Sequence, residues 1–169
     1  IALTLATLLN LSSCHVDVKT AFLHGKVDED IYLRPPPQME QGVALKLKRA
    51  LYGLRQSPKL WWNCVFDALT KIGFRSCRTD SCFFIKGEKS NLQMITVHVD
   101  DFGIFGSDEQ IKSVINHLET EFDIKILGAV TNYLGVSIVR RDDTTFISQP
   151  DKIMELLAKF QMSNCTSVS

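Results

Sequence analysis

Two adjacent carboxylates, Asp100 and Asp101, interrupt an apolar stretch that runs from Met94 to Phe105 and reads M-I-T-V-H-V-D-D-F-G-I-F. The alternation before the pair and the apolar residues after it predict two strands joined by a hairpin, with both carboxylates at its tip. Neighbouring carboxylates repel each other, and a divalent cation would remove that repulsion. A solvated acidic turn is the alternative, and this stretch alone favours neither interpretation.

A third carboxylate, Asp17, lies in the segment C-H-V-D-V at residues 14–18, where apolar and polar residues alternate. This alternation predicts a half-buried strand whose polar side carries Asp17. Carboxylates from neighbouring strands that meet at one sheet edge can hold two divalent ions about 3.5–4 Å apart. Mg²⁺ suits such a site because it needs only one or two carboxylates besides substrate phosphates. Asp17, Asp100 and Asp101 are therefore candidate ligands for metal ions that act on a phosphoryl group.

Helices and strands around these carboxylates must position them. Ser57 as N-cap and Pro58 at the first helical position predict a helix that Gly73 ends, and a capping box at Ser107 and Gln110 predicts a second. Further strands are predicted at 31–33, 43–47, 82–86, 92–99, 102–105, 123–127, 133–140 and 145–148, and further helices at 1–11 and 150–160. Helix 1–11 is apolar nearly all round, so it is expected either to be buried or to be truncated from a larger packing context. The order of these elements predicts an α+β fold in which helices pack on one face of a sheet.

Composition sets broad limits on the class of protein. The 169 residues suffice for a domain with a core, and a formal net charge of zero gives no general argument for nucleic acid or membrane partners. Residues 41–79 nevertheless carry eight basic residues and one acidic residue, either a local basic zone or ordinary solvated faces. The five cysteines form no C-x-x-C pair, which argues against a disulfide framework or zinc site and fits a reducing compartment.

Three longer motifs carry a family resemblance. D-V-K-T-A-F-L-H-G at 17–25, L-Y-G-L-R-Q-S-P-K-L-W at 51–61 and H-V-D-D at 98–101 resemble the reverse transcriptase of copia-type (Ty1/copia) LTR retrotransposons. Supporting matches are K-I-L-G at 125–128, Y-L-G at 133–135 and I-S-Q-P-D-K-I at 147–153. The resemblance implies a polymerase palm with a ferredoxin-like antiparallel sheet over residues 1–128. Residues 129–169 would form a primer-grip-like hairpin and the beginning of the thumb or connection.

The resemblance also assigns roles to individual residues. It makes Asp17, Asp100 and Asp101 catalytic and, with the Val18 carbonyl, ligands of two Mg²⁺ ions that Mn²⁺ could replace. Nucleotide binding would involve Val18, Lys19, Thr20, Ala21, Phe22 and Gln56, with the Phe22 ring beneath the sugar. Template and primer binding would involve Gly53, Leu54, Arg55, Ser57, Pro58, His98, Tyr133, Leu134 and Gly135. His98 departs from the family, which usually has tyrosine there.

Several of these residues also have simpler interpretations. Phe22 could be an ordinary core residue, and Arg55 could be a solvated loop charge. Trp61 and Trp62 are expected to pack within their helix rather than stack on bases. We expect His15, His24 and His117 to lie at the surface or in loops, because their spacing suggests no metal cluster.

The implied activity is RNA-directed DNA polymerase, in which a primer 3′-hydroxyl attacks the α-phosphate of a deoxynucleotide. The implied partners are an RNA or DNA template with primer, dNTPs and the rest of a Pol polyprotein, with integrase upstream and ribonuclease H downstream, and no membrane. The implied localisation is intracellular, in cytoplasmic virus-like particles or in the nucleus. A triphosphate clamp in fingers preceding residue 1 is expected, so the chain by itself should be a poor polymerase or none. The alternatives are a catalytically inactive remnant and an RNA-binding module that uses exposed aromatics on a sheet face.

Overall fold

A six-stranded antiparallel sheet organises the chain. The computed structural model describes residues 1–39, 42–88 and 91–165. The strand order is β4-β5-β6-β7-β1-β8, and neighbouring strands pair antiparallel. These strands are β1 (Ser12–Val18), β4 (Arg75–Ser76), β5 (Phe83–Lys86), β6 (Gln93–His98), β7 (Asp101–Gly106) and β8 (Ile124–Gly128).

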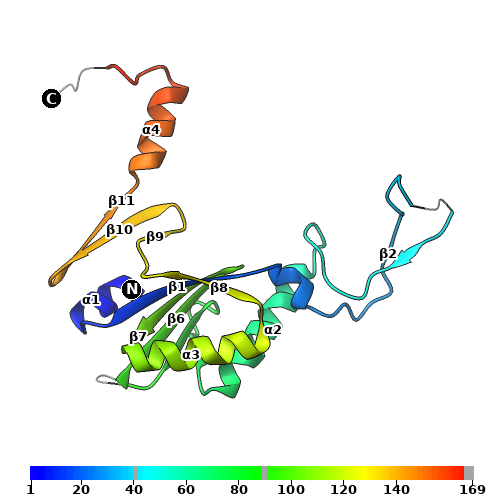
Figure 1. The fold of residues 1–169 in the computed structure, drawn as a ribbon, viewed down its shortest axis with the longest axis horizontal. Coiled ribbons are helices and arrows are strands. Elements are labelled where there is room, and N and C mark those ends of the chain that lie inside the picture. Colours follow the sequence, from blue (N-terminus) through cyan, green and yellow to red (C-terminus); the bar gives the residue numbers. More distant parts are fainter. Residues whose placement is uncertain (40–41, 89–90, 166–169) are drawn as a thin grey trace.

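Two helices cover one face of this sheet (Figure 1). Helix α2 (Ser57–Lys71) lies between β1 and the β6–β7 hairpin in the chain, and α3 (Asp108–Glu121) lies between β7 and β8. The four neighbouring strands β6-β7-β1-β8, with these two crossovers, have the topology of a ferredoxin-like fold. The predicted α+β class, with helices packed on one face of an antiparallel sheet, is confirmed.

The residues predicted to begin and end helices α2 and α3 are partly confirmed. Ser107 and Gln110 form the predicted capping box, and Gly73 follows α2 with a φ of +86°. The prediction that Ser57 is the N-cap of α2 is wrong, because α2 begins at Ser57 and Gln56 is its N-cap. The Ser57 side chain is fully buried, and its hydroxyl donates to the Leu51 carbonyl at 2.5 Å. Ser57 therefore fixes the segment that precedes α2.

The main core lies between the sheet and these helices. Its strand residues alternate along β1 and β7, and its helix residues recur at helical spacing, as the sequence predicts. The buried members from these elements are Cys14, Val16, Val18, Phe102, Ile104, Trp61, Val65, Ala68, Leu69, Ile111, Val114 and Leu118. Because successive side chains of a strand point to opposite faces, the residues between them lie on the other face of the sheet.

Helix α1 (Ala2–Leu8) and a three-stranded sheet cover part of that other face. The small sheet has the order β11-β10-β9, from Thr144–Ser148, Val136–Arg141 and Asn132–Tyr133. A second core cluster joins it to α1 and the main sheet through Ala6, Met94, Phe105, Val130 and Ile138. Arg140 donates to the carbonyl oxygen of Ala6 at 3.1 Å, which ties β10 to α1.

The helix predicted over residues 1–11 is shorter than expected, and of its two alternatives the buried one is wrong. Helix α1 has seven residues, of which Ala6 alone is buried, whereas Ile1 is 89% exposed and Leu8 75% exposed. The helix is apolar on more sides than it can bury, because it contacts the rest of the chain through one face only.

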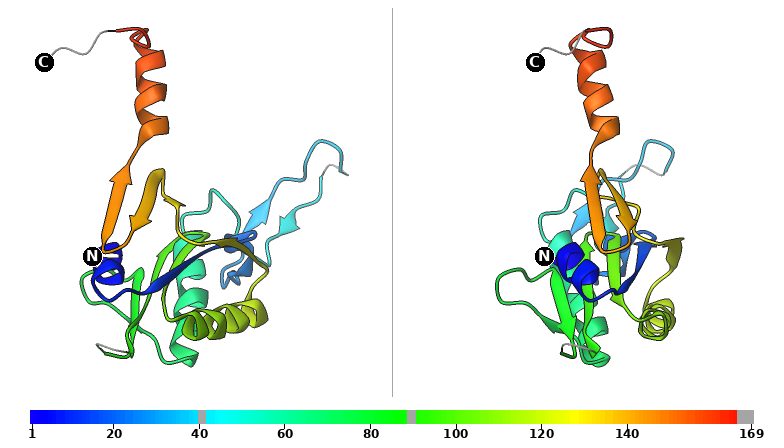
Figure 2. Two further views of the ribbon diagram at one scale, coloured as in Figure 1. Left: turned by 60° about the vertical axis from the view of Figure 1, so that its left-hand side comes forward. Right: turned by 90° about the vertical axis from the view of Figure 1, so that its left-hand side faces the viewer.

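Two parts of the chain extend from this body (Figures 1 and 2). One is an arm with the short strands β2 (Tyr32–Leu33) and β3 (Leu45–Lys46), which are shorter than the predicted strands 31–33 and 43–47. The other is α4 (Pro150–Lys159), in which every residue is exposed or half-buried. A division of the chain between residues 128 and 129 stays a prediction. In the described part of the chain, no helix is both long and apolar enough to cross a membrane.

Candidate active site

Four polar residues form a row across the uncovered part of the sheet, on the face away from α2 and α3. Asp17 of β1 lies directly opposite Asp101 of β7, and Asp101 lies directly opposite His98 of β6. On its other side Asp17 lies opposite Lys125 of β8. The predictions that Asp17 faces away from the core and neighbours Asp101 are therefore confirmed. Like charges directly opposite each other destabilise a strand pair, so the stability of the sheet does not explain the two aspartates.

Asp100 lies in the two-residue turn between β6 and β7, and Val99 is the other turn residue. The prediction that both adjacent aspartates form the hairpin tip is thus half wrong, since Asp101 already belongs to β7. Val99 has a φ of +55°, in the left-handed region that a β-branched residue rarely adopts. Both turn carbonyls have donors: the Trp61 indole N–H donates to Val99 O at 2.6 Å, and the Val18 N–H donates to Asp100 O at 2.8 Å.

His15 contacts the candidate site, and the prediction of a surface or loop position for it is wrong. Its side chain is 13% exposed, and its Nε2 lies 2.9 Å from Asp101 Oδ1. The His15 ring also meets the Tyr133 ring edge to face, with centroids 5.4 Å apart. The alternation of residues 14–18 puts His15 beside Asp17 on one face, and that signal could have identified it.

The other two histidines pack against the helices. His24 meets the Trp61 and Phe122 rings at centroid distances of 5.7 and 5.1 Å. His117 Nε2 lies 2.9 Å from the Ala68 carbonyl oxygen, which joins α3 to α2. Both are structural residues of the helical layer.

A second row behind the first supports it. Gly103 of β7 lies between His15 of β1 and Thr96 of β6. The Thr96 hydroxyl lies 3.1 Å from the Tyr133 phenol oxygen, which connects β9 to the main sheet. A Cβ atom at Gly103 would lie 2.6 Å from Thr96 Oγ1, so the second row requires glycine there.

We expect the substitution Gly103→Ala to lower the free energy of unfolding by about 1–3 kcal/mol, because the added methyl group overpacks the second row. The variant Thr96→Ala removes the clashing hydroxyl, so the double variant should be more stable than the sum of the two single effects predicts. Urea unfolding of the four proteins measures this coupling. Strictly additive free energies would contradict the steric explanation.

The predicted nucleotide-binding residues after β1 lie in different environments. Val18 and Ala21 are buried in the main core, so their side chains pack there. Lys19 and Thr20 are exposed, and Lys19 Nζ lies 2.9 Å from Asp123 Oδ1. Thr20 has a φ of +51° and precedes a short 3₁₀ helix, η1 (Ala21–His24), which the sequence did not predict.

Phe22 is 8% exposed and belongs to the main core. Its ring lies against the ring of Tyr52, with centroids 4.4 Å apart, and Tyr52 is 63% exposed. The pKa of the Tyr52 phenol is raised, first by desolvation and then by the negative charges of Asp100 and Asp17. Tyr52 therefore packs on Phe22 and is exposed to the charges of these carboxylates. Sequence reasoning placed Tyr52 within a motif but gave it no role.

The predicted connector residues differ in exposure. Gly53, Arg55 and Pro58 are exposed, and Leu54 and Gln56 are half-buried. Gly53 has a φ of +97°, which only glycine adopts readily. The connector between β3 and α2 therefore offers exposed groups near Tyr52, while the buried Ser57 side chain does not reach the surface.

Of the predicted primer-grip residues, Tyr133 ends β9, and Leu134 and Gly135 form the turn between β9 and β10. Leu134 and Gly135 are exposed and both have positive φ, 53° and 74°, as a tight hairpin turn requires. Tyr133 is half-buried, and burial raises the pKa of its phenol, with a smaller contribution from the charge of Asp101. Tyr133 therefore fixes the β9–β10 hairpin to the main sheet. The exposed turn residues, Leu134 and Gly135, are the part of the hairpin that is accessible to a ligand.

The donor set fits a hard divalent cation. Asp17, Asp100 and Asp101 are half-buried, and oxygen ligands of this kind suit Mg²⁺. Among residues 1–39, 42–88 and 91–165, however, no three His, Cys, Asp or Glu side chains are grouped so as to hold a metal. The Asp101 carboxylate is hydrogen-bonded to His15. A cation here would have to compete with His15 for Asp101.

A family model described as "Reverse transcriptase (RNA-dependent DNA polymerase)" matches residues 1–169. The chain belongs to this reverse transcriptase family. The "Retrovirus-related Pol polyprotein from transposon TNT 1-94" of Nicotiana tabacum is 35% identical to it over 176 residues, 99% of this chain and 13% of that polyprotein. The corresponding polyprotein from transposon RE1 of Arabidopsis thaliana is 30% identical over 159 residues, 91% of this chain and 11% of the polyprotein.

A yeast relative extends the similarity to Ty1. The "Truncated transposon Ty1-A Gag-Pol polyprotein" of Saccharomyces cerevisiae is 33% identical over 129 residues, 75% of this chain and 10% of that protein. These relatives confirm the resemblance to copia-type reverse transcriptases. The chain is a reverse transcriptase domain of the kind found in retrotransposon Pol polyproteins, and it spans 13% or less of the length of these relatives.

Proposed function

We propose that this reverse transcriptase domain is the catalytic palm of an RNA-directed DNA polymerase within a Pol polyprotein. The observation that carries the proposal is the pairing of Asp17 with Asp101 across β1 and β7, with Asp100 in the adjoining turn. Two of these acidic residues lie opposite each other on neighbouring strands and the third lies in the adjoining turn, although the repulsion between like charges costs stability. Binding of a phosphorylated substrate with cations explains this arrangement.

In the proposed reaction the primer 3′-oxygen forms a bond to the α-phosphorus of a dNTP. The bond between the α-phosphorus and the bridging oxygen breaks, pyrophosphate leaves, and the hydroxyl proton passes to solvent. Two Mg²⁺ ions, or Mn²⁺ in their place, would lower the pKa of the hydroxyl and neutralise charge on the leaving oxygens. The ligands would be Asp17, Asp100, Asp101 and the Val18 carbonyl.

Other residues of the domain would hold the substrates. Tyr52 packs on Phe22 and presents an exposed ring, against which the sugar of a nucleotide would rest. Lys125, opposite Asp17, supplies an exposed ammonium group for phosphate oxygens. The connector around Arg55 and the turn at Leu134 and Gly135 would contact template and primer.

The remaining proposals follow the family. The partners would be an RNA or DNA template with primer, dNTPs, and the integrase and ribonuclease H parts of the polyprotein. The place of action would be cytoplasmic virus-like particles and the nucleus. A degenerate copy of the element, without activity, is the competing reading.

Primer extension by a Pol protein that contains this domain tests the proposal. We expect incorporation of dNTPs on an RNA template with Mg²⁺ or Mn²⁺, and loss of incorporation with a chelator. A folded protein that binds primer and template but adds no nucleotide with either metal would favour the inactive copy.

Metal binding can be tested without activity. We expect Mn²⁺ to stabilise the domain by mass action, by about 2.7 kcal/mol at a hundredfold excess over Kd, and Asp100→Asn to reduce this effect. The variant His15→Phe keeps a ring beside Tyr133 but loses the bond to Asp101. It should therefore shift the Mn²⁺ midpoint about three- to tenfold lower.

Thermal unfolding across a Mn²⁺ titration measures these shifts. Asp142→Asn, in the turn between β10 and β11, is the matched control and should behave as the unaltered domain. A melting temperature that is independent of Mn²⁺ in a folded sample would contradict the metal site. An unchanged midpoint in His15→Phe would contradict competition for Asp101.

A further inference from the structure

The turn that carries Asp100 is strained at its first residue. Two-residue hairpins need a positive φ at the first turn position, where Gly, Asn or Asp is preferred. Val99 occupies that position with a φ of +55°, and its branched side chain disfavours this conformation. Such a conformation persists only where the surrounding structure holds it.

Trp61 supplies a contact that can hold the turn. Its indole N–H donates to the Val99 carbonyl at 2.6 Å, from the first turns of α2. The adjoining Asp100 carbonyl accepts from the Val18 N–H at 2.8 Å. The turn is thus held from the helical layer on one side and from β1 on the other.

Packing fixes the Trp61 ring itself. The side chain is 3% exposed, and its ring lies edge to face against Phe122 and Phe102, with centroids 5.0 and 6.5 Å away. Because packing holds the Trp61 indole in place, its hydrogen bond also restricts the position of the Val99 carbonyl. We infer that Trp61 is a positioning residue of the polymerase centre, whose indole N–H holds the strained Val99–Asp100 turn so that Asp100 stays beside Asp17 and Asp101. The inference rests on the proposed function.

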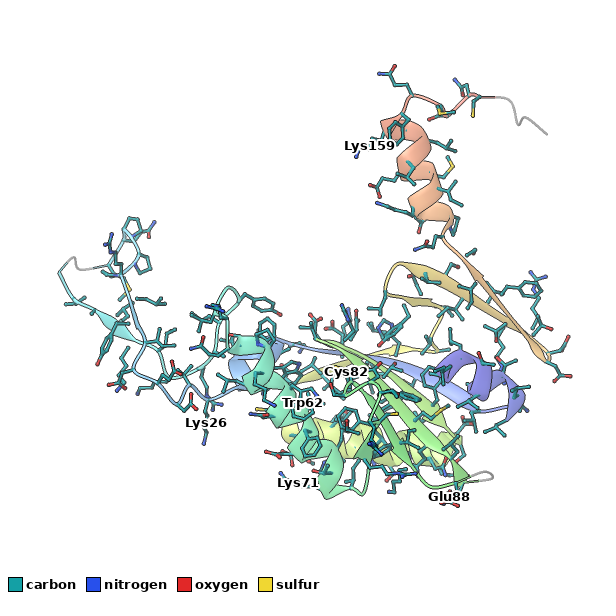
Figure 3. All side chains as sticks on the ribbon, turned by 180° about the vertical axis from the view of Figure 1, so that it is seen from behind. Lys26, Trp62, Lys71, Cys82, Glu88 and Lys159 are labelled. Atoms are coloured by element: carbon teal, nitrogen blue, oxygen red, sulfur yellow. The ribbon has the colours of Figure 1, made fainter. Side chains whose placement is uncertain are left out.

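The next residue provides a matched control. Trp62 also donates its indole N–H to a backbone carbonyl, that of Ser81, at 3.2 Å. Trp62 stacks on Phe66, with centroids 5.0 Å apart, and lies beside the start of β5 near Cys82 (Figure 3). The two tryptophans therefore make the same kind of hydrogen bond, but only the Trp61 bond reaches the turn with Asp100.

The experiment compares W61F with W62F, because both variants keep an aromatic ring and lose one indole donor. In a Pol protein that contains this domain, W61F should lower kcat for dNTP addition about tenfold, with little change in KM for template and primer. W62F should change kcat less than about twofold. Equal effects of the two variants on kcat would overturn the inference.

Hydrogen exchange of the Val18 amide gives a readout that does not depend on activity. This amide donates to the turn, so its exchange should be about tenfold faster in W61F and unchanged in W62F. The amide of Phe105, at the far end of the hairpin, should not change in either variant. An unchanged Val18 exchange rate in W61F would overturn the inference. If the unaltered Pol protein shows no primer extension but Val18 exchange is faster in W61F, the proposed function is wrong. The inference that Trp61 holds the turn is then still supported.

The variant V99G relieves the strain of the turn, and V99G alone measures what the loss of Val99 packing against the main core costs. Glycine adopts the left-handed conformation without strain, so W61F should cost kcat only about two- to threefold in the V99G background. If W61F alone does not fold, the double variant V99G/W61F should fold, because the turn no longer needs the indole. A double variant that is unfolded, or that loses as much kcat as W61F alone, would overturn the inference.

Discussion

Replacing Asp17 by Asn should abolish nucleotide incorporation while leaving the metal-free domain as stable as the unaltered one, or more stable. Asp17 lies directly opposite Asp101, so the substitution removes a like-charge repulsion across β1 and β7. We expect a gain of up to about 0.5 kcal/mol in the free energy of unfolding without metal. Loss of one metal-binding carboxylate should lower kcat by about a thousandfold or more, equivalent to about 4 kcal/mol of transition-state stabilisation.

These opposite directions distinguish a catalytic aspartate from a structural one. Urea unfolding in chelator measures stability, and single-nucleotide primer extension by a Pol protein containing the domain measures kcat. Asp108→Asn, in the first turn of α3, is the control. It removes one negative charge, as Asp17→Asn does, but outside the group Asp17, Asp100 and Asp101. It should lose a little stability, because acidic residues favour a helix N-terminus, and should retain kcat. An Asp17→Asn variant that is destabilised but still active would reverse the assignment.

Replacing Phe22 by Ala should have two separable effects. The first is a loss of about 3–5 kcal/mol of stability, because Phe22 is 8% exposed and belongs to the main core. The second is weaker discrimination against ribonucleotides, by about a hundredfold, if the ring and its neighbour Tyr52 limit the space beneath the sugar. The structure supports the core role directly, while the selective role stays a prediction.

A ratio of specificity constants separates the two effects of Phe22→Ala. The quotient of kcat/KM for a dNTP and the matching rNTP does not depend on the fraction of folded enzyme. Phe66→Ala is the control, since Phe66 is a half-buried residue that packs against the same core, beside Trp62. It should lower stability and leave the quotient unchanged. An unchanged quotient in Phe22→Ala would make Phe22 a core residue only.

Local patterns in the sequence determined the class of fold and the family. The capping box at Ser107 needs contacts only within one helical turn, so a short stretch of sequence specifies it. Alternation in residues 14–18 likewise specified which face of β1 carries Asp17. Short elements escaped prediction: the two residues of β4 and the four of η1 are too few to show a period.

Contacts between distant residues decided the composition of the site. The bond from His15 to Asp101 joins residues 86 positions apart, and Lys125 meets Asp17 only because β8 pairs with β1 in one register. Tyr52 packs on Phe22 from a loop, and Trp61 reaches the Val99 turn from a helix. The sequence left the burial of apolar helix 1–11 open for the same reason, since burial depends on which residues a helix contacts and not on its own composition. Periodicity along a chain records which face a side chain occupies, whereas its partners on that face follow from strand register and helix packing, which arise only when the whole chain has folded.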